Sequence, residues 1–153
     1  MLKSIAFLTL LALPVQAQDA QSFAQNLYAT MQAQPFDPAA LSALYAEDYT
    51  DHDRIPGPPE ASDRDLILGL VAALNTGLPD GKRQLNTVET LSDGRIMVHF
   101  TFTGTQTGPF LNYPPAGKPV EFDGVDIFRL HDGRITEQWH VEEVAALMAQ
   151  LGE

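Results

Sequence analysis

One acidic residue interrupts an otherwise apolar pattern in the second half of the chain. Alternate positions between residues 119 and 131 are apolar apart from Asp126; they are Val120, Phe122, Gly124, Asp126, Phe128 and Leu130. Such alternation is typical of a strand with one face in the core. A carboxylate on that face must be neutralised, paired or used for chemistry, because an isolated buried charge is very costly. Asp126 is therefore the first candidate for a catalytic residue.

The chemistry open to Asp126 is general acid/base catalysis. Its ordinary pKa is about 3.9, and burial beside Phe122 and Phe128 is expected to raise it. A carboxyl group of raised pKa in an apolar pocket can remove or return a proton next to a carbonyl group. Two other interpretations stay open: a structural acid paired with an arginine or a backbone donor, and a register shifted by one residue that turns Asp126 outward.

Histidines are natural partners for such an acid because their ordinary pKa lies near neutrality. His52 stands between two aspartates, and His140 ends a predicted strand. We predict that both assist Asp126 in catalysis. A spacing typical of metal ligands, such as His-x-x-x-His, does not occur in the sequence, so we predict no metal site. Aromatic side chains are expected to line the pocket, although such residues often simply pack in the core; those chosen are Tyr49, Phe110, Phe128 and Trp139.

Composition narrows the class of protein. With 153 residues the chain is long enough for one domain with a core. Its formal net charge of −11 argues against nucleic acid and anionic membrane surfaces as partners. The lack of cysteine excludes disulfides, cysteine-zinc sites and thiol nucleophiles. Phosphate-binding glycine loops, G-x-S-x-G and H-E-x-x-H motifs do not occur either, so we expect no cofactor.

The first 17 residues have the pattern of a secretory signal peptide. Lys3 precedes the apolar run Ile5–Leu13, and Val15-Gln16-Ala17 supplies a small-residue cleavage site. The alternatives are a buried helix or a membrane anchor, but the run is shorter than the roughly 20 residues that span a bilayer. We expect cleavage after Ala17, a single mature domain of residues 18–153, and a periplasmic or secreted protein without stable membrane insertion.

The spacing of apolar residues predicts helices first and strands afterwards. Helices are expected at 18–34, after the N-cap pair Asp37-Pro38, after Ser62 and near the C-terminus, with residues 46–62 as a loop. Strands are expected at 82–91 and 96–103, followed by two long antiparallel strands joined at Asp132-Gly133. This order predicts an α+β fold in which a curved antiparallel sheet wraps over the N-terminal helices and encloses a pocket. Asp126 would point into that pocket.

Three segments in the second half resemble a known family. They are G-T-Q-T-G at 104–108, P-P-A-G-K-P at 114–119 and G-V-D-I-F-R at 124–129, preceded upstream by L-Y-A-E-D-Y-T-D-H-D at 44–53. In this order they are similar to segments of the SnoaL-like polyketide cyclase or ester cyclase family, from about Phe23 to the C-terminus. The resemblance implies a cone-shaped α+β fold of the nuclear transport factor two-like superfamily, often dimeric through its sheet.

The resemblance also implies a role for two positions. The acid of G-V-D would be the general acid/base of an intramolecular aldol ring closure that needs no metal or cofactor, and that acid is Asp126. Where the family usually has a histidine in G-T-H-x-G, this chain has Gln106. A glutamine can donate a hydrogen bond to a developing oxyanion, so Gln106 is predicted to bind substrate.

Three functions remain open on the sequence. The first is an exported, cofactor-free acid/base enzyme of cyclase, isomerase or lyase type that acts on a small apolar carbonyl compound. The second is a small-molecule binding protein that uses the same pocket without turnover. The third is a partner-binding protein that uses the outer face of the sheet, and a homodimer is expected in any case.

Overall fold

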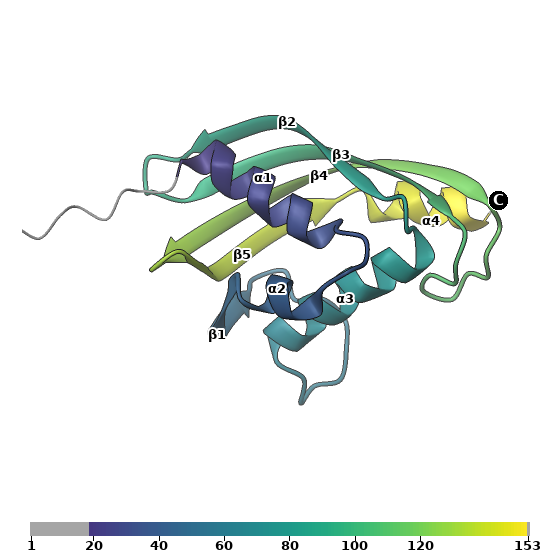
Figure 1. Cartoon of the computed structure of the whole chain (residues 1–153), viewed down its shortest axis with the longest axis horizontal. Helices are drawn as coiled ribbons and strands as arrows, with labels where there is room; N and C mark the ends of the chain where they lie inside the picture. Colours follow the sequence, from purple (N-terminus) through teal and green to yellow (C-terminus); the bar gives the residue numbers. More distant parts are fainter. Residues whose placement is uncertain (1–18, 153) are drawn as a thin grey trace, which may run out of the picture.

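The computed structural model describes residues 19–152, so the predicted signal peptide lies outside the described residues. Four helices and five strands follow one another in a single α+β domain (Figure 1); they are α1 (Ala20–Met31), α2 (Pro38–Ser42), β1 (Tyr45–Asp51), α3 (Asp63–Gly77), β2 (Lys82–Thr90), β3 (Ile96–Gln106), β4 (Lys118–His131), β5 (Arg134–Glu142) and α4 (Val144–Gly152). Among these helices, none has the length and apolar character needed to cross a bilayer.

The five strands form one curved sheet in the order β1-β5-β4-β3-β2. Figure 1 shows α1 and α3 on the same side of this sheet, with α4 following β5 at one end. The pairs β2–β3, β3–β4 and β4–β5 are antiparallel, as the sequence predicted. The pair β1–β5 is parallel, which makes the sheet mixed rather than antiparallel throughout.

The prediction of a loop over residues 46–62 was wrong for its first part, because residues 45–51 form β1. The sequence of β1, YAEDYTD, is polar and its burial does not alternate strictly. Its pairing partner is β5, more than 80 residues further along the chain in the register Asp51↔Gln138. A strand held by such a distant partner leaves little trace in local periodicity.

The turn at Asp132-Gly133 joins β4, which contains Asp126, to β5 in a long hairpin. Asp132 and Gly133 have φ angles of 49° and 76° between β4 and β5. Positive φ at both central positions is the geometry of the two-residue hairpin turns that match the twist of the strands, and Asp-Gly is a preferred pair there. The prediction of two antiparallel strands joined at Asp132-Gly133 is confirmed.

The helix starts are set by side chains that accept hydrogen bonds from free backbone N–H groups. The Asp37 carboxylate accepts from the N–H groups of Ala39 and Ala40 at the start of α2. The Ser62 side chain accepts from the N–H of Asp65 at the start of α3. Both caps were predicted from the sequence, and both are confirmed.

The core lies between α1 and the concave face of the sheet. Phe23 on α1 packs edge-on against Phe128 of β4, with ring centroids 5.4 Å apart. Tyr28 on α1 packs against Phe100 of β3, with centroids 5.6 Å apart. The alternate residues 120–128 of β4 are all buried, so Asp126 faces the core as predicted and the shifted register is excluded.

Candidate active site

Asp126 lies in the middle of β4, where it is only 5% exposed. In the sheet register its neighbours are Val98 on β3 and His140 on β5. Its carboxylate accepts a hydrogen bond from the Tyr28 hydroxyl at 2.5 Å and another from the Gln138 amide at 3.1 Å. The acid is therefore held by neutral donors from α1 and β5, without a direct ion pair.

This surrounding sets the protonation behaviour of Asp126. Burial raises the pKa of its carboxyl above the ordinary value for aspartate, although the Tyr28 hydrogen bond and the positive charges of Arg83 and His140 partly oppose this rise. Burial and the nearby Asp126 raise the pKa of the Tyr28 hydroxyl far above its usual value, so Tyr28 stays a donor. A carboxyl group of raised pKa is a stronger base when it ionises, and this is the property that proton abstraction requires.

His140 forms a partly buried ion pair with Asp51 at the end of β1, with 3.2 Å between His140 Nε2 and an Asp51 carboxylate oxygen. The hydrogen bond to Asp51 raises the pKa of His140 to about 9 against the opposing effect of burial, and the charges of Asp51 and Asp126 add to the rise. For Asp51, burial works toward a higher pKa, but the hydrogen bond and charge of His140 bring the pKa below its usual value. At neutral pH His140 is therefore a cation able to donate a proton.

Asp126 lines a small chamber whose wall combines apolar side chains with a cluster of polar ones; we call it the inner chamber. It has a volume of about 20 Å³, and its polar lining residues are Arg83, Asp126, Gln138, His140 and Glu142. Burial, followed by the charge of Asp126, raises the pKa of Glu142. Among residues 19–152, no group of three acidic or histidine side chains is placed to hold a metal ion.

A larger apolar cavity, the outer chamber, adjoins the inner one. Its volume is about 630 Å³, within the usual range for small-molecule sites. The two chambers share five lining residues, namely Ile55, Leu70, Leu74, His140 and Glu142. Leu111, Val144 and Met148 also line the outer chamber and are 40–52% exposed, so apolar surface reaches solvent at this chamber. Together the chambers suit a compound with a polar group at one end and an apolar body.

Of the predicted catalytic residues, the structure brings Asp126 and His140 together but not His52. The His52 ring stacks on Trp139 with centroids 4.1 Å apart, and its Nε2 lies 2.9 Å from a Glu137 carboxylate oxygen. Glu137 and Trp139 alternate with Gln138 and His140 along β5 and therefore lie on the opposite face of the sheet. His52 and Trp139 are thus on the outer face, away from Asp126.

The remaining predicted binding residues lie in four different settings. Phe110 is buried and lines the outer chamber. Tyr49 does not line either described chamber, but its hydroxyl donates to Gln138 Oε1 at 2.9 Å and so supports a partner of Asp126. Phe128 is fully buried against α1. Gln106 is fully buried and donates its amide to the carbonyl oxygens of Tyr113 and Pro114, so it holds the 107–117 loop.

The sequence analysis predicted His140 but missed other residues around Asp126. Gln138 and Glu142 lie two positions before and after His140 on the same strand, and three polar residues at alternate positions could have indicated a site. Tyr28 lies beside Leu27 on the buried side of α1, where its hydroxyl needs a partner. No local sequence pattern marked Arg83 as a site residue, because only the folding of the chain brings it into the same chamber as Asp126.

The Tyr28 hydroxyl offers a direct test of how the Asp126 pKa is set. In Tyr28→Phe the hydrogen bond that favours the charged carboxylate is lost, so the pKa of Asp126 is expected to rise further. A ¹³C NMR titration of the labelled aspartate carboxyl groups would measure the change. The ring packing against Phe100 is retained in this variant, and an unchanged or lower pKa would show that the Tyr28 hydrogen bond does not control ionisation.

The chain and its fold are similar to those of known proteins. The profile of the SnoaL-like polyketide cyclase family matches residues 19–151. Three similar solved structures come from Streptomyces species, each with a TM-score of 0.71. IdmH of Streptomyces antibioticus, a proposed polyketide cyclase, is 25% identical, and the alignment covers 89% of this chain and all of that one.

The other two structures are somewhat less similar in sequence. TsrD of Streptomyces laurentii is 23% identical, with 86% of this chain and 93% of that chain covered. AclR of Streptomyces galilaeus, a proposed hydroxylase, is 22% identical, with 87% and 80% covered. A comparison with curated proteins gave no match.

The fold is the α+β cone of the nuclear transport factor two-like superfamily, as the resemblance implied. The chain belongs to the SnoaL-like polyketide cyclase family. That membership supports a cyclase-like function without a cofactor and a small-molecule substrate.

Proposed function

We propose that this protein is a cofactor-free acid/base enzyme that forms an enolate from an apolar carbonyl compound, with Asp126 as the base. The observation that carries the proposal is the position of Asp126: a buried carboxyl group of raised pKa in a small chamber with other polar groups, next to a large apolar chamber. The substrate would place its carbonyl group toward the inner chamber and its apolar body in the outer chamber.

The reaction would begin with proton removal. Asp126 takes a proton from the carbon next to the carbonyl group, the C–H bond breaks, and its electron pair forms the enolate. In a compound with a second carbonyl group the enolate carbon attacks that group and closes a ring, which is the aldol chemistry of a cyclase. His140 lines both chambers and is cationic at neutral pH, so it donates the proton that the resulting alkoxide needs.

A general probe of enolate formation tests this proposal before the natural substrate is known. The compound 2-tetralone has an acidic carbon beside a carbonyl group on an apolar bicyclic body. In D₂O the protein is expected to speed the incorporation of deuterium at that carbon above the buffer rate, as followed by ¹H NMR. A 2-tetralone that binds but exchanges only at the buffer rate would contradict enolate formation.

The second candidate function is binding without turnover, and Gln106 favours it. The family's usual histidine position is occupied here by an amide whose two hydrogen bonds go to loop carbonyls. This function predicts that ligands raise the unfolding temperature through preferential binding to the folded state. The ligand would be recovered chemically unchanged and unlabelled.

Gly69 on α3 provides a test of the outer chamber with a built-in control. It lines this chamber, and a Cβ at this position meets no atom within 4 Å. Gly69→Ala is expected to stabilise the protein by about 0.5–1 kcal/mol, because glycine inside a helix costs conformational entropy. Gly69→Phe places a ring in the chamber and is expected to weaken 2-tetralone binding by about tenfold, or about 1.4 kcal/mol.

Urea unfolding measures the first effect and NMR titration with 2-tetralone measures the second. Gly69→Ala serves as the control, since it changes the helix while leaving the chamber open. Equal affinity of the Phe and Ala variants would show that the ligand lies elsewhere.

We further propose that two copies pair through the outer face of the sheet. Two cross-strand rows lie side by side there, Met97–Ile127–Trp139 and His99–Val125–Val141. Val141 is 73% exposed, an unusual exposure for an apolar strand residue. Sedimentation should give a dimer for the wild type and a monomer for Val141→Lys, whereas a monomeric wild type would contradict the pairing.

Export through a signal peptide cleaved after Ala17 is proposed as well. The family match begins at residue 19, directly beyond the expected cleavage point. Mass analysis of the protein from a periplasmic or culture fraction should give a chain that begins at Gln18. A chain that keeps Met1 would contradict the proposal.

A further inference from the structure

Arg83 on β2 brings a positive charge to the inner chamber, and within residues 19–152 the guanidinium forms no ion pair. Its Nε is buried and has no hydrogen-bond partner. A buried donor on a charged group is costly when it stays unpaired, so such a group usually has a partner. The missing partner points to a ligand.

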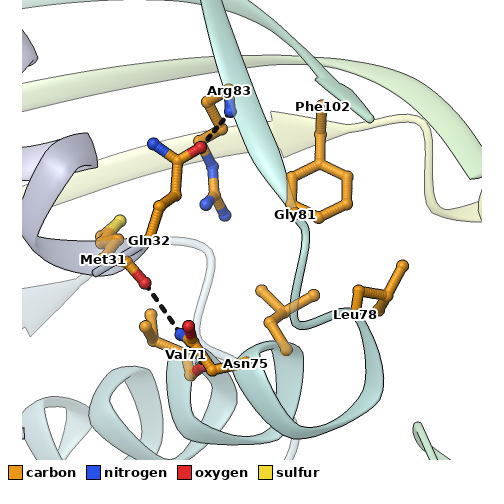
Figure 2. Close-up of a pocket in the computed structure, with 9 residues that line it drawn as sticks. Met31, Gln32, Val71, Asn75, Leu78, Gly81, Arg83 and Phe102 are labelled. Atoms are coloured by element: carbon orange, nitrogen blue, oxygen red, sulfur yellow. Dashed lines mark hydrogen bonds between the residues drawn. The ribbon is translucent and has the colours of Figure 1, made fainter. Parts of the chain in front are cut away.

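Surrounding residues hold the Arg83 side chain in place. Its guanidinium carbon lies 5.5 Å from the ring centroid of Tyr28 and 5.3 Å from those of Phe100 and Phe102, distances typical of cation–π contacts. The backbone N–H of Arg83 donates to Gln32 Oε1 and anchors this end of β2, and Figure 2 shows the side chain running from β2 toward α3. The position of the charge is therefore fixed before any ligand binds.

The size of the inner chamber limits what this charge can meet. About 20 Å³ is room for one water-sized group, because a single water needs about 10–15 Å³ measured in this way. A carboxylate with two oxygens or a ring does not fit without rearrangement, whereas one carbonyl oxygen does. Asp126 lines the same chamber, so an oxygen there would lie near both the base and the guanidinium.

We propose that Arg83 is the oxyanion-binding residue of the site and donates hydrogen bonds to the substrate oxygen as the enolate forms. The inference rests on the proposed function and adds a group that it did not assign. The C–H bond breaks, the proton passes to Asp126, and the electron pair moves through the new C=C bond to leave its charge on oxygen. Arg83 keeps its own protons throughout. A fixed donor aimed at developing charge stabilises the transition state more than the ground state.

A phenol tests this inference without any turnover. Like an enolate, 4-nitrophenolate carries its negative oxygen on an sp² carbon, and it absorbs visible light whereas the neutral phenol does not. The wild type is expected to bind the phenolate at least about tenfold more tightly than the phenol, because hydrogen bonds from charged donors are the stronger ones. The bound probe then ionises at lower pH than the free probe.

Arg83→Met keeps an apolar chain of similar length against the three rings and removes the charge. It is expected to lose the tenfold preference for phenolate while keeping its affinity for the neutral phenol. Lys82→Met is the matched control, because Lys82 is the adjacent, exposed cation on β2 and does not line the inner chamber. Should Arg83→Met not unfold cooperatively, Arg83→Gln takes its place.

A wild type without phenolate preference would overturn the inference, as would an Arg83→Met protein that keeps the preference. A preference that Lys82→Met removes equally would also overturn it, since the effect would then come from net charge. These outcomes are separate from a failure of the proposed function, which would appear as absent deuterium exchange with phenolate binding intact.

Discussion

Asp126→Asn is expected to lower the rate of deuterium incorporation into 2-tetralone by about 10²–10⁴-fold, the usual contribution of a general base. Asparagine has nearly the same shape and can keep hydrogen bonds to Tyr28 and Gln138 after the amide orients, but it cannot accept a proton. The substitution also removes a buried carboxyl group, so the fold should be retained. Circular dichroism and urea unfolding check that the variant is folded.

Asp123→Asn is the matched control for this effect. Asp123 belongs to the same strand but has the opposite parity, and its half-exposed side chain accepts a hydrogen bond from Thr101 at 2.6 Å. Its substitution removes one negative charge near the site without touching either chamber. A loss of exchange of the same size in both variants would mean that overall charge, and not the Asp126 carboxylate, governs the rate.

The second large effect concerns the His140–Asp51 pair and the pH dependence of stability. The pKa of His140 is about 9 in the folded protein, whereas the ordinary value for histidine, which applies in the unfolded chain, is 6.5. A group whose folded pKa is raised contributes its full stabilisation below pH 6.5 and loses it as the pH rises through about 9. The whole rise corresponds to about 3.4 kcal/mol of unfolding free energy, of which the larger part is lost between pH 6.5 and pH 9.

Urea unfolding of the wild type and of Asp51→Asn measures this contribution. The wild type should lose about 2–3 kcal/mol between pH 6.5 and pH 9, whereas the variant should show a much flatter profile because its histidine has no charged partner. The lowered pKa of Asp51 reports the same ion pair and is not counted again. Parallel pH profiles in the two proteins would show that the pair does not stabilise the fold.

The sequence could predict Asp126 as a site residue because apolar residues alternate along the strand that contains it. Asp126 stands out because its neighbours on β4 at steps of two are apolar, and a strand presents such positions on one face. The helix caps at Asp37 and Ser62 and the turn at Asp132 could also be predicted, because each depends on residues close in sequence. The order of helices and strands then defined the fold class.

The rest of the site depends on contacts between distant parts of the chain. Tyr28 meets Asp126 across 98 positions of sequence, and Arg83 reaches the chamber from β2. His52 was predicted to assist Asp126 because β1 was not recognised as a strand. Once residues 45–51 extend along β5, Asp51 points inward to His140 while the next residue, His52, turns to the outer face.

Gln106 illustrates the limit of transferring a role by motif. Its place in the G-T-Q-T-G segment predicted a substrate contact, but its amide is held by the carbonyl groups of Tyr113 and Pro114. In our proposal oxyanion binding and proton donation are the roles of Arg83 and His140, because both residues line the inner chamber with Asp126. In this chain the polar groups around the acid come from β2 and β5.

The most direct test of Asp126 as the base measures binding and exchange in one NMR sample of Asp126→Asn with 2-tetralone in D₂O. Line broadening of the ligand reports binding, and loss of its signal at the acidic carbon reports exchange. We expect the variant to bind the ketone as the wild type does while exchange falls to the buffer rate. A variant that binds the ketone and exchanges it as fast as the wild type would contradict the assignment of Asp126 as the catalytic base.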